Sequence, residues 1–116
     1  NIPMAIGSAA ITFNIDFVLD NLNIRHFFKT IVSADDVSVS KPDPETYTKA
    51  AQQLGIDATN CLVFEDAPKG VEAALNAGMN SVVLTLLHEQ HEFEKYPNVL
   101  RYIKDYVGLT PGELIK

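Results

Sequence analysis

Short runs of apolar residues alternate along this chain with longer segments whose apolar residues recur every three or four positions. The short runs cover residues 4–6, 30–33, 61–64 and 81–84, and each is followed by small or polar residues. An uninterrupted apolar run of this length is typical of a strand buried on both faces, whereas the longer periodic segments are typical of amphipathic helices. The alternation predicts an α/β fold, a three-layer α/β/α core with a mostly parallel sheet.

Local end signals place helices between these runs. Asn23 follows one periodic segment and Gly55 follows another, and both residue types end helices in the left-handed conformation. The segment Asp43-Pro44-Glu45 supplies a capping aspartate and a proline for the first turn. Helices are therefore expected over residues 14–22, 44–54, 68–77 and 99–107, the last of them carried by Val99, Leu100, Ile103 and Val107 and ended by Gly108.

Composition excludes several classes of function. The 116 residues carry a net charge of −6 and no cluster of Lys or Arg, which predicts a poor nucleic-acid binder, because neutralising phosphates needs positive charge. No apolar run approaches the length of a membrane span. Cys61 is the single cysteine and cannot form an internal disulfide, which favours a reducing, cytoplasmic compartment. The expectation is one globular domain over residues 1–116.

The carboxyl ends of parallel strands are where such sheets bind ligands. Glu65 and Asp66 directly follow one predicted strand, and two adjacent carboxylates repel each other unless a cation lies between them. Hard oxygen ligands of this kind suit Mg²⁺, often together with a substrate phosphate. The alternative is that Asp66 only caps the helix beginning near Pro68, while Glu65 is solvated.

Two further residues are candidates for binding a phosphate. Ser8 follows the first predicted strand in the small-residue turn Gly7-Ser8-Ala9-Ala10, where backbone N–H groups and a hydroxyl can approach an anion. Lys41 lies in Ser40-Lys41-Pro42-Asp43-Pro44, and the two prolines lower the entropic cost of holding its ammonium in place. An ordinary turn and a surface lysine are the alternatives. Taken together, the hydroxyl, the ammonium and the acid pair predict a magnesium-dependent phosphate site.

These segments resemble the second, third and fourth motifs of the haloacid dehalogenase-like superfamily, in particular its β-phosphoglucomutase-like phosphatases. The resemblance runs to about Leu84 and rests on residues 5–8, 40–45 and 62–74. It implies a Rossmann-like core and a role for each candidate. Ser8 and the N–H of Ala9 would bind the transferring phosphoryl group, Lys41 would neutralise the phosphate and the nucleophile, and Glu65 and Asp66 would hold Mg²⁺.

The sequence departs from the family pattern in one respect. The family's first motif is a strand ending in Asp-x-Asp, which supplies the nucleophile and the general acid, and neither this motif nor the helical cap domain stands in these residues. The family places that strand centrally, between the strands that end at Ser8 and Asp66. The expectation is a partial core domain with two unpaired inner strand edges. A preceding segment or a second chain would fill the slot, and the 116 residues alone would be marginally stable or aggregation-prone.

The resemblance implies a magnesium-dependent phosphatase that acts on a small phosphorylated metabolite resembling a sugar phosphate. The phosphoryl group would pass through an aspartyl-phosphate whose aspartate lies outside this chain. One alternative is a phosphomutase of the β-phosphoglucomutase type. Another is that the chain as it stands is catalytically inert, a fragment or a binding module. A phosphoacceptor signalling domain requires its acidic residues on other strands and is disfavoured.

Overall fold

The computed structural model describes residues 2–106, and its strands form two parallel sheets. One sheet is the pair β1 (Ala5–Gly7) and β2 (Thr30–Val32), and the other runs in the order β3 (Leu62–Glu65), β4 (Asn80–Leu84) and β5 (Val99–Ile103). The helices are α1 (Thr12–Leu22), α2 (Glu45–Leu54) and α3 (Pro68–Asn76). The predicted α/β class with parallel strands is confirmed. Within these residues, no helix has both the length and the apolar character that crossing a bilayer requires.

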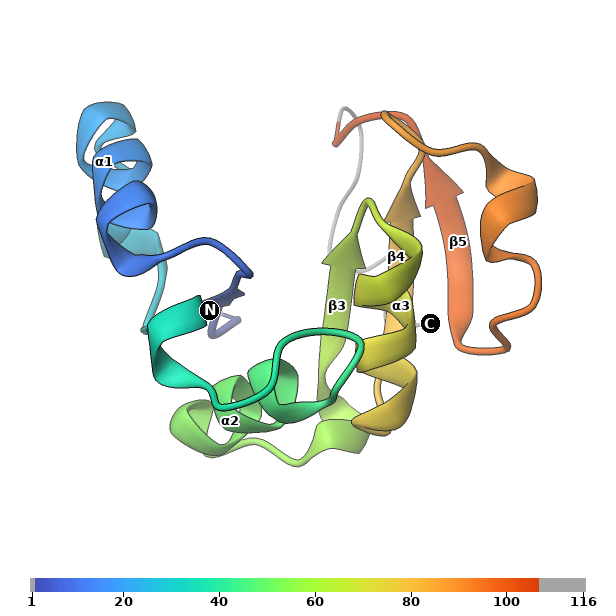
Figure 1. Ribbon diagram of the computed structural model, residues 1–116, viewed down its shortest axis with the longest axis horizontal. Coiled ribbons are helices and arrows are strands. Elements are labelled where there is room, and N and C mark those ends of the chain that lie inside the picture. The colour runs from blue at the N-terminus through green and yellow to red at the C-terminus, as the bar shows by residue number, and fades with distance from the viewer. Residues whose placement is uncertain (1, 107–116) are drawn as a thin grey trace.

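Helix α2 joins the two sheets. It packs against β1 and β2 on one side and against α3 on the other, and Figure 1 shows it in green between the two halves of the molecule. Its buried face and the inner face of α3 enclose a core made of Tyr47, Ala51, Val63, Ala73, Ala74 and Met79. This cluster fixes the orientation of β3 relative to α2, and through α2 relative to β1.

The helix ends follow the signals in the sequence. Asn23 has a φ of 55° and Gly55 a φ of 72°, and each lies directly after its helix. The Asp43 carboxylate accepts a hydrogen bond from the N–H of Glu45, the first residue of α2, at 3.0 Å, although the N-cap position itself is occupied by Pro44. The first helix begins slightly earlier than expected, at Thr12.

The helix predicted over residues 99–107 is wrong for the part that the structure describes, because Val99–Ile103 forms strand β5. Val107 and Gly108 lie outside the described residues. The apolar spacing fits either structure, but β-branched and aromatic side chains favour a pleated surface. Parallel pairing with β4 makes this segment a strand. Its side chains Val99 and Tyr102 pack against a second buried cluster of Val71, Val83 and Phe93.

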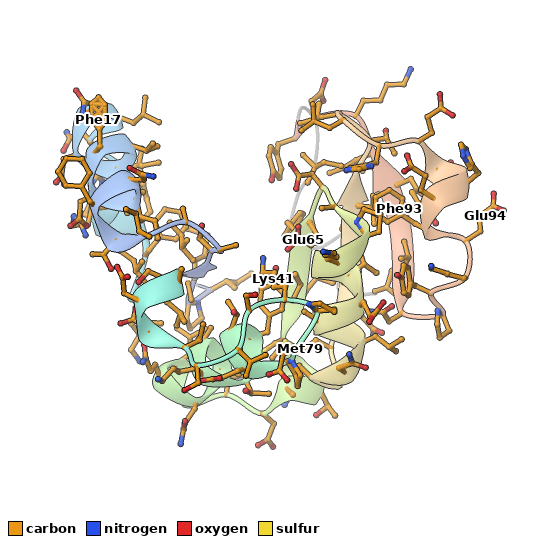
Figure 2. All side chains as sticks on the ribbon, viewed as in Figure 1. Phe17, Lys41, Glu65, Met79, Phe93 and Glu94 are labelled. Carbon is orange, nitrogen blue, oxygen red and sulfur yellow. The ribbon has the colours of Figure 1, made fainter. Side chains whose placement is uncertain are left out.

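The inner edges of both sheets are unpaired within residues 2–106, since β1 pairs with β2 alone and β3 with β4 alone. Helix α1 also exposes large apolar side chains, with Phe13 76% and Phe17 59% accessible. Figure 2 shows Phe17 pointing outward, away from the packed side chains around Met79 and Phe93. The unpaired strand edges agree with the expected open slot between β1 and β3.

We predict that this free chain unfolds over a broad range of urea concentration and associates at high protein concentration. Unpaired strand edges and exposed apolar groups favour edge-to-edge association over a stable monomer. Circular dichroism and sedimentation measure the two effects. Phe17→Glu is expected to reduce association without lowering stability, because Phe17 contributes exposed surface. A sharp, reversible unfolding transition of the monomer at all concentrations would contradict the prediction.

Candidate active site

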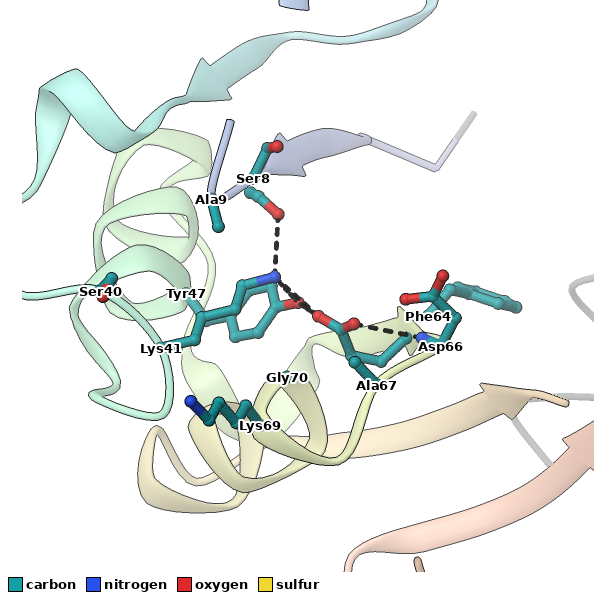
Figure 3. Close-up of a pocket in the computed structure, with 12 residues that line it drawn as sticks. Ser8, Ala9, Ser40, Lys41, Tyr47, Phe64, Asp66, Ala67, Lys69 and Gly70 are labelled. Carbon is teal, nitrogen blue, oxygen red and sulfur yellow. Dashed lines mark hydrogen bonds and ion pairs between the residues drawn. The ribbon is translucent and has the colours of Figure 1, made fainter. Parts of the chain in front are cut away.

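The carboxyl ends of β1 and β3 meet the loop before α2 at one cavity of about 470 Å³. Its lining includes all the candidate residues predicted from the sequence, namely Ser8, Ala9, Lys41, Glu65 and Asp66. Figure 3 shows Lys41 reaching into this space, with Ser8 above it and Asp66 on the opposite side of the space. Residues that lie far apart in the sequence therefore share one site.

Lys41 and Glu65 form the centre of the site. The Lys41 Nζ atom lies 2.7 Å from Glu65 Oε2, and only 14% and 8% of the two side chains are exposed. Lys41 is thus not a surface lysine, and Glu65 is not solvated, so both alternatives considered from the sequence are wrong. The ammonium also donates to the Gly7 carbonyl oxygen at 3.3 Å, which ties the loop before α2 to the end of β1.

Tyr47 is a third member of this cluster, and no sequence pattern singled it out. Its hydroxyl accepts a hydrogen bond from Lys41 Nζ at 2.8 Å and donates one to Glu65 Oε2. Burial raises the pKa of Tyr47, and the negative charge of Glu65 raises it further. The phenol therefore stays protonated near neutral pH and acts as a donor to the carboxylate.

Two glycines permit this close packing. A Cβ atom on Gly70 would lie 1.8 Å from Glu65 Cδ, so α3 approaches the carboxylate as closely as it does only because Gly70 has no side chain. A Cβ atom on Gly7 would lie 3.0 Å from Thr46 Cγ2 and 3.1 Å from the Tyr47 ring. The glycine of the fourth motif thus has a direct steric reason, which the sequence alone did not reveal.

The turn after β1 is held by its own hydrogen bonds. The Ser8 hydroxyl oxygen accepts from the N–H of Ala10 at 3.0 Å, and the N–H of Ala34 donates to the Ala10 carbonyl at 2.9 Å. The Ser8 hydroxyl oxygen therefore has the local role expected of an ordinary turn. The Ser8 hydroxyl proton and the Ala9 N–H, however, have no acceptor among residues 2–106, so both remain able to donate to an anion in the cavity.

Asp35 contributes to the same loop from β2. Its carboxylate accepts a hydrogen bond from the N–H of Thr12 at 2.9 Å, at the first turn of α1. Asp36 accepts from the N–H of Ser33 at 2.8 Å, and these hydrogen bonds from Ser33 lower the pKa of Asp36. Asp35 thus holds the backbone that follows Ser8, whereas Asp36 holds the turn after β2, and the position of both acids directly after a strand was the available sequence signal.

Asp66 does not cap α3: the residue preceding that helix is Ala67, and no side chain bonds to the first turn. Within the described range its carboxylate makes no hydrogen bond or ion pair, although its N–H donates to Glu65 Oε1 at 3.1 Å. Asp66 thus lines the cavity with a carboxylate that has no partner among residues 2–106.

The acid pair fits part of a Mg²⁺ site. Residues 2–106 hold no group of three or more His, Cys, Asp or Glu side chains that could by itself bind a metal ion. Mg²⁺, however, commonly uses one or two carboxylates and completes its octahedron with water and substrate phosphate. Since Glu65 Oε2 is engaged by Lys41 and Tyr47, Asp66 and Glu65 Oε1 are the oxygens that remain for a cation.

Comparison with known proteins finds phosphatases among the relatives of this chain. Over 85 residues the chain is 42% identical to the fructose-1-phosphate phosphatase YqaB of Escherichia coli, covering 73% of this chain and 45% of that protein. It is 35% identical over 88 residues to the validoxylamine A 7'-phosphate phosphatase of Streptomyces hygroscopicus, covering 76% and 41%. The chain therefore spans less than half the length of these curated relatives.

Comparison with solved structures finds a similar fold in a related enzyme. The crystal structure of β-phosphoglucomutase from Clostridium difficile superposes with a TM-score of 0.82 at 29% identity, covering 98% of this chain and 48% of that one. The family model for the haloacid dehalogenase-like hydrolases matches residues 1–84, the part that contains β1 to β4 and every residue discussed at the cavity. The chain belongs to the haloacid dehalogenase-like hydrolase family.

Proposed function

We propose that the protein acts as a magnesium-dependent phosphatase on a small phosphorylated metabolite that resembles a sugar phosphate. The observation that supports this most strongly is the single cavity that holds Ser8, Lys41 and Asp66 together. The relatives add support, because the two curated ones are named as phosphatases of fructose 1-phosphate and of validoxylamine A 7'-phosphate.

In this proposal each residue at the cavity has one task. The Ser8 hydroxyl and the Ala9 N–H donate hydrogen bonds to the phosphoryl oxygens, and Lys41 places a positive charge beside them. The Lys41 bond to the Gly7 carbonyl is its longest, at 3.3 Å, so this is the contact that a phosphate oxygen displaces. Asp66 and Glu65 would hold Mg²⁺, which supplies further neutralisation of the phosphoryl charge.

The nucleophile is proposed to be an aspartate on a segment that is not among these residues. Asp66 is the one aspartate that lines the cavity within the described part of the chain, and it is assigned to the metal. The unpaired edges of β1 and β3 flank the cavity, so a strand entering between them would deliver its last residue to the phosphate. That strand comes from a preceding segment or from a second chain, and it completes the sheet.

Two other functions follow from specific observations. The likeness to β-phosphoglucomutase supports a phosphomutase, in which the phosphoryl group returns to a sugar instead of to water. The lack of an unassigned aspartate at the cavity, among residues 2–106, supports a chain that binds phosphate and Mg²⁺ without turnover. We favour the phosphatase because both curated relatives cited above are phosphatases.

Asp66→Asn tests the proposal with little change in shape. We expect the substitution to lower kcat/KM for sugar phosphates by about 100-fold or more, because it removes a metal-ligand charge. The assay uses this chain and any longer natural protein that contains it, with fructose 1-phosphate among the substrates. Glu94→Gln is the matched control, since it also removes one carboxylate but lies on the far side of the molecule (Figure 2).

The outcomes separate the candidate functions. Loss of turnover in Asp66→Asn, with normal turnover in Glu94→Gln, supports the hydrolase. Near-normal turnover in Asp66→Asn excludes the assigned metal site. Transfer of phosphate to a second sugar at the expense of free phosphate identifies the mutase, and binding without any turnover in all forms identifies the inert module.

A further inference from the structure

Tyr47 contacts both members of the Lys41–Glu65 pair. Lys41 Nζ stands 4.6 Å from the centre of the Tyr47 ring, within cation–π range, and donates to the Tyr47 hydroxyl at 2.8 Å. The same hydroxyl donates to Glu65 Oε2. One side chain therefore binds the ammonium through its oxygen and ring face, and the carboxylate through its proton (Figure 3).

The ring of Tyr47 cannot easily move. It lies in the first turn of α2, is only 7% exposed, and packs in the core cluster with Ala51 and Val63. On its remaining side β1 passes so closely that a Cβ atom on Gly7 would lie 3.1 Å from the ring. A side chain held by a core on one side and backbone on the other is a rigid reference point for the groups that bind it.

This fixed hydroxyl determines how Glu65 presents its oxygens. Oε2 accepts hydrogen bonds from Lys41 and Tyr47, whereas Oε1 accepts one from the Asp66 N–H at 3.1 Å. A carboxylate oxygen that accepts two hydrogen bonds has little capacity left for a cation. The orientation therefore leaves Oε1, which accepts one hydrogen bond, as the Glu65 oxygen with capacity left for a cation.

The ammonium is constrained in the same way. A lysine ammonium has three N–H donors, and those of Lys41 are directed at Tyr47, Glu65 and the Gly7 carbonyl. Two of the three bonds run to the rigid pair, so the third points toward the end of β1, where Ser8 begins the candidate phosphate loop.

We propose that Tyr47 is a positioning residue that sets the direction of both the Glu65 carboxylate and the Lys41 ammonium. Its hydroxyl keeps Glu65 Oε1 beside Asp66 for a divalent cation, and it keeps the third Lys41 donor at the phosphate side of the cavity. This inference rests on the proposed function of the same site. Outer partners of this kind, which bind the ligating groups instead of the metal, typically tune metal affinity strongly.

Tyr47→Phe and Tyr47→Leu, made in the full chain, test the inference. Phe keeps the ring and its packing but removes the hydroxyl, whereas Leu removes both. The first measurement is Mn²⁺ affinity, with Mn²⁺ as a paramagnetic probe of the magnesium site. The second is the rate at which Lys41 is acylated by acetic anhydride, with the exposed Lys69 at the rim of the same cavity as internal control.

We expect Tyr47→Phe to melt within a few degrees of the parent, yet to bind Mn²⁺ about 10-fold more weakly. Lys41 in this variant should be acylated several-fold faster, because its ammonium loses one hydrogen bond. The acylation rate of Lys69 should not change. A purely structural role predicts the opposite pattern, in which Mn²⁺ affinity and acylation follow the melting temperature and change only in Tyr47→Leu.

Asp66→Asn separates failure of this inference from failure of the proposed function. If Asp66→Asn loses Mn²⁺ binding while Tyr47→Phe binds Mn²⁺ and protects Lys41 as the parent does, the positioning role is overturned and the metal site stands. If the parent binds no Mn²⁺, or if Asp66→Asn binds it equally well, both the site and the inference are overturned.

Discussion

Replacing Gly70 with alanine is expected to destabilise the fold by about 3 kcal/mol and to disrupt the candidate site. The new Cβ atom would lie 1.8 Å from Glu65 Cδ and 2.0 Å from Glu65 Oε2, so either the carboxylate or the start of α3 must move. Alanine gains about 1 kcal/mol over glycine inside a helix, which is too little to offset this overlap. Urea denaturation gives the change in the free energy of unfolding.

Gly55→Ala is the matched control for this substitution. Gly55 ends α2 with a φ of 72°, and a Cβ atom added there would have no neighbouring atom within 4 Å. Alanine there meets backbone strain alone, at a cost of about 1–2 kcal/mol, and leaves the cavity intact. Equal stability losses in the two variants, or unchanged Mn²⁺ binding in Gly70→Ala, would show that α3 does not press on Glu65 as described.

Lys41→Ala is expected to have the larger effect, a loss of about 3–5 kcal/mol together with loss of phosphate binding. The substitution leaves the Glu65 carboxylate, 8% exposed, without its cationic partner. Removing one member of a buried pair is costly because the other remains as an uncompensated charge. Thermal or urea unfolding measures the first effect, and calorimetry with inorganic phosphate measures the second.

The double variant Lys41→Met with Glu65→Gln distinguishes the two effects. It removes both charges and keeps a Tyr47 hydrogen-bond acceptor, so we expect it to regain much of the stability but none of the phosphate binding. Lys69→Ala serves as the control, because that exposed lysine lines the same cavity and should change stability by less than about 0.5 kcal/mol. Phosphate binding retained by Lys41→Ala would remove Lys41 from the site.

The sequence was sufficient to predict that the candidate residues would lie together at one cavity. Apolar runs placed Ser8 and Asp66 after strands, and parallel strands bring their carboxyl ends to one edge. The two prolines that follow Lys41 correctly indicated a constrained lysine. These inferences succeed because they depend on local patterns and on one general rule of sheet topology.

Other features depend on tertiary contacts that no local pattern contains. Val99–Ile103 fits helix and strand equally well until β4 is there to pair with it. Tyr47 resembles any apolar residue on the buried face of α2, and only the folded chain shows that its hydroxyl meets Lys41 and Glu65. The requirement for glycine at position 70 likewise arises from a side chain five positions away, on β3.

The most direct test of the central claim is an NMR titration of the ¹⁵N-labelled chain with inorganic phosphate, with and without Mg²⁺. The claim is that Ser8, Lys41, Glu65 and Asp66 form one site for both ions. The predicted result is that the amides of Ala9 and Asp66 shift together, and that Mg²⁺ raises the affinity for phosphate. Shifts confined to residues outside the cavity would contradict the claim. So would an affinity for phosphate that changes neither on addition of Mg²⁺ nor in Lys41→Ala.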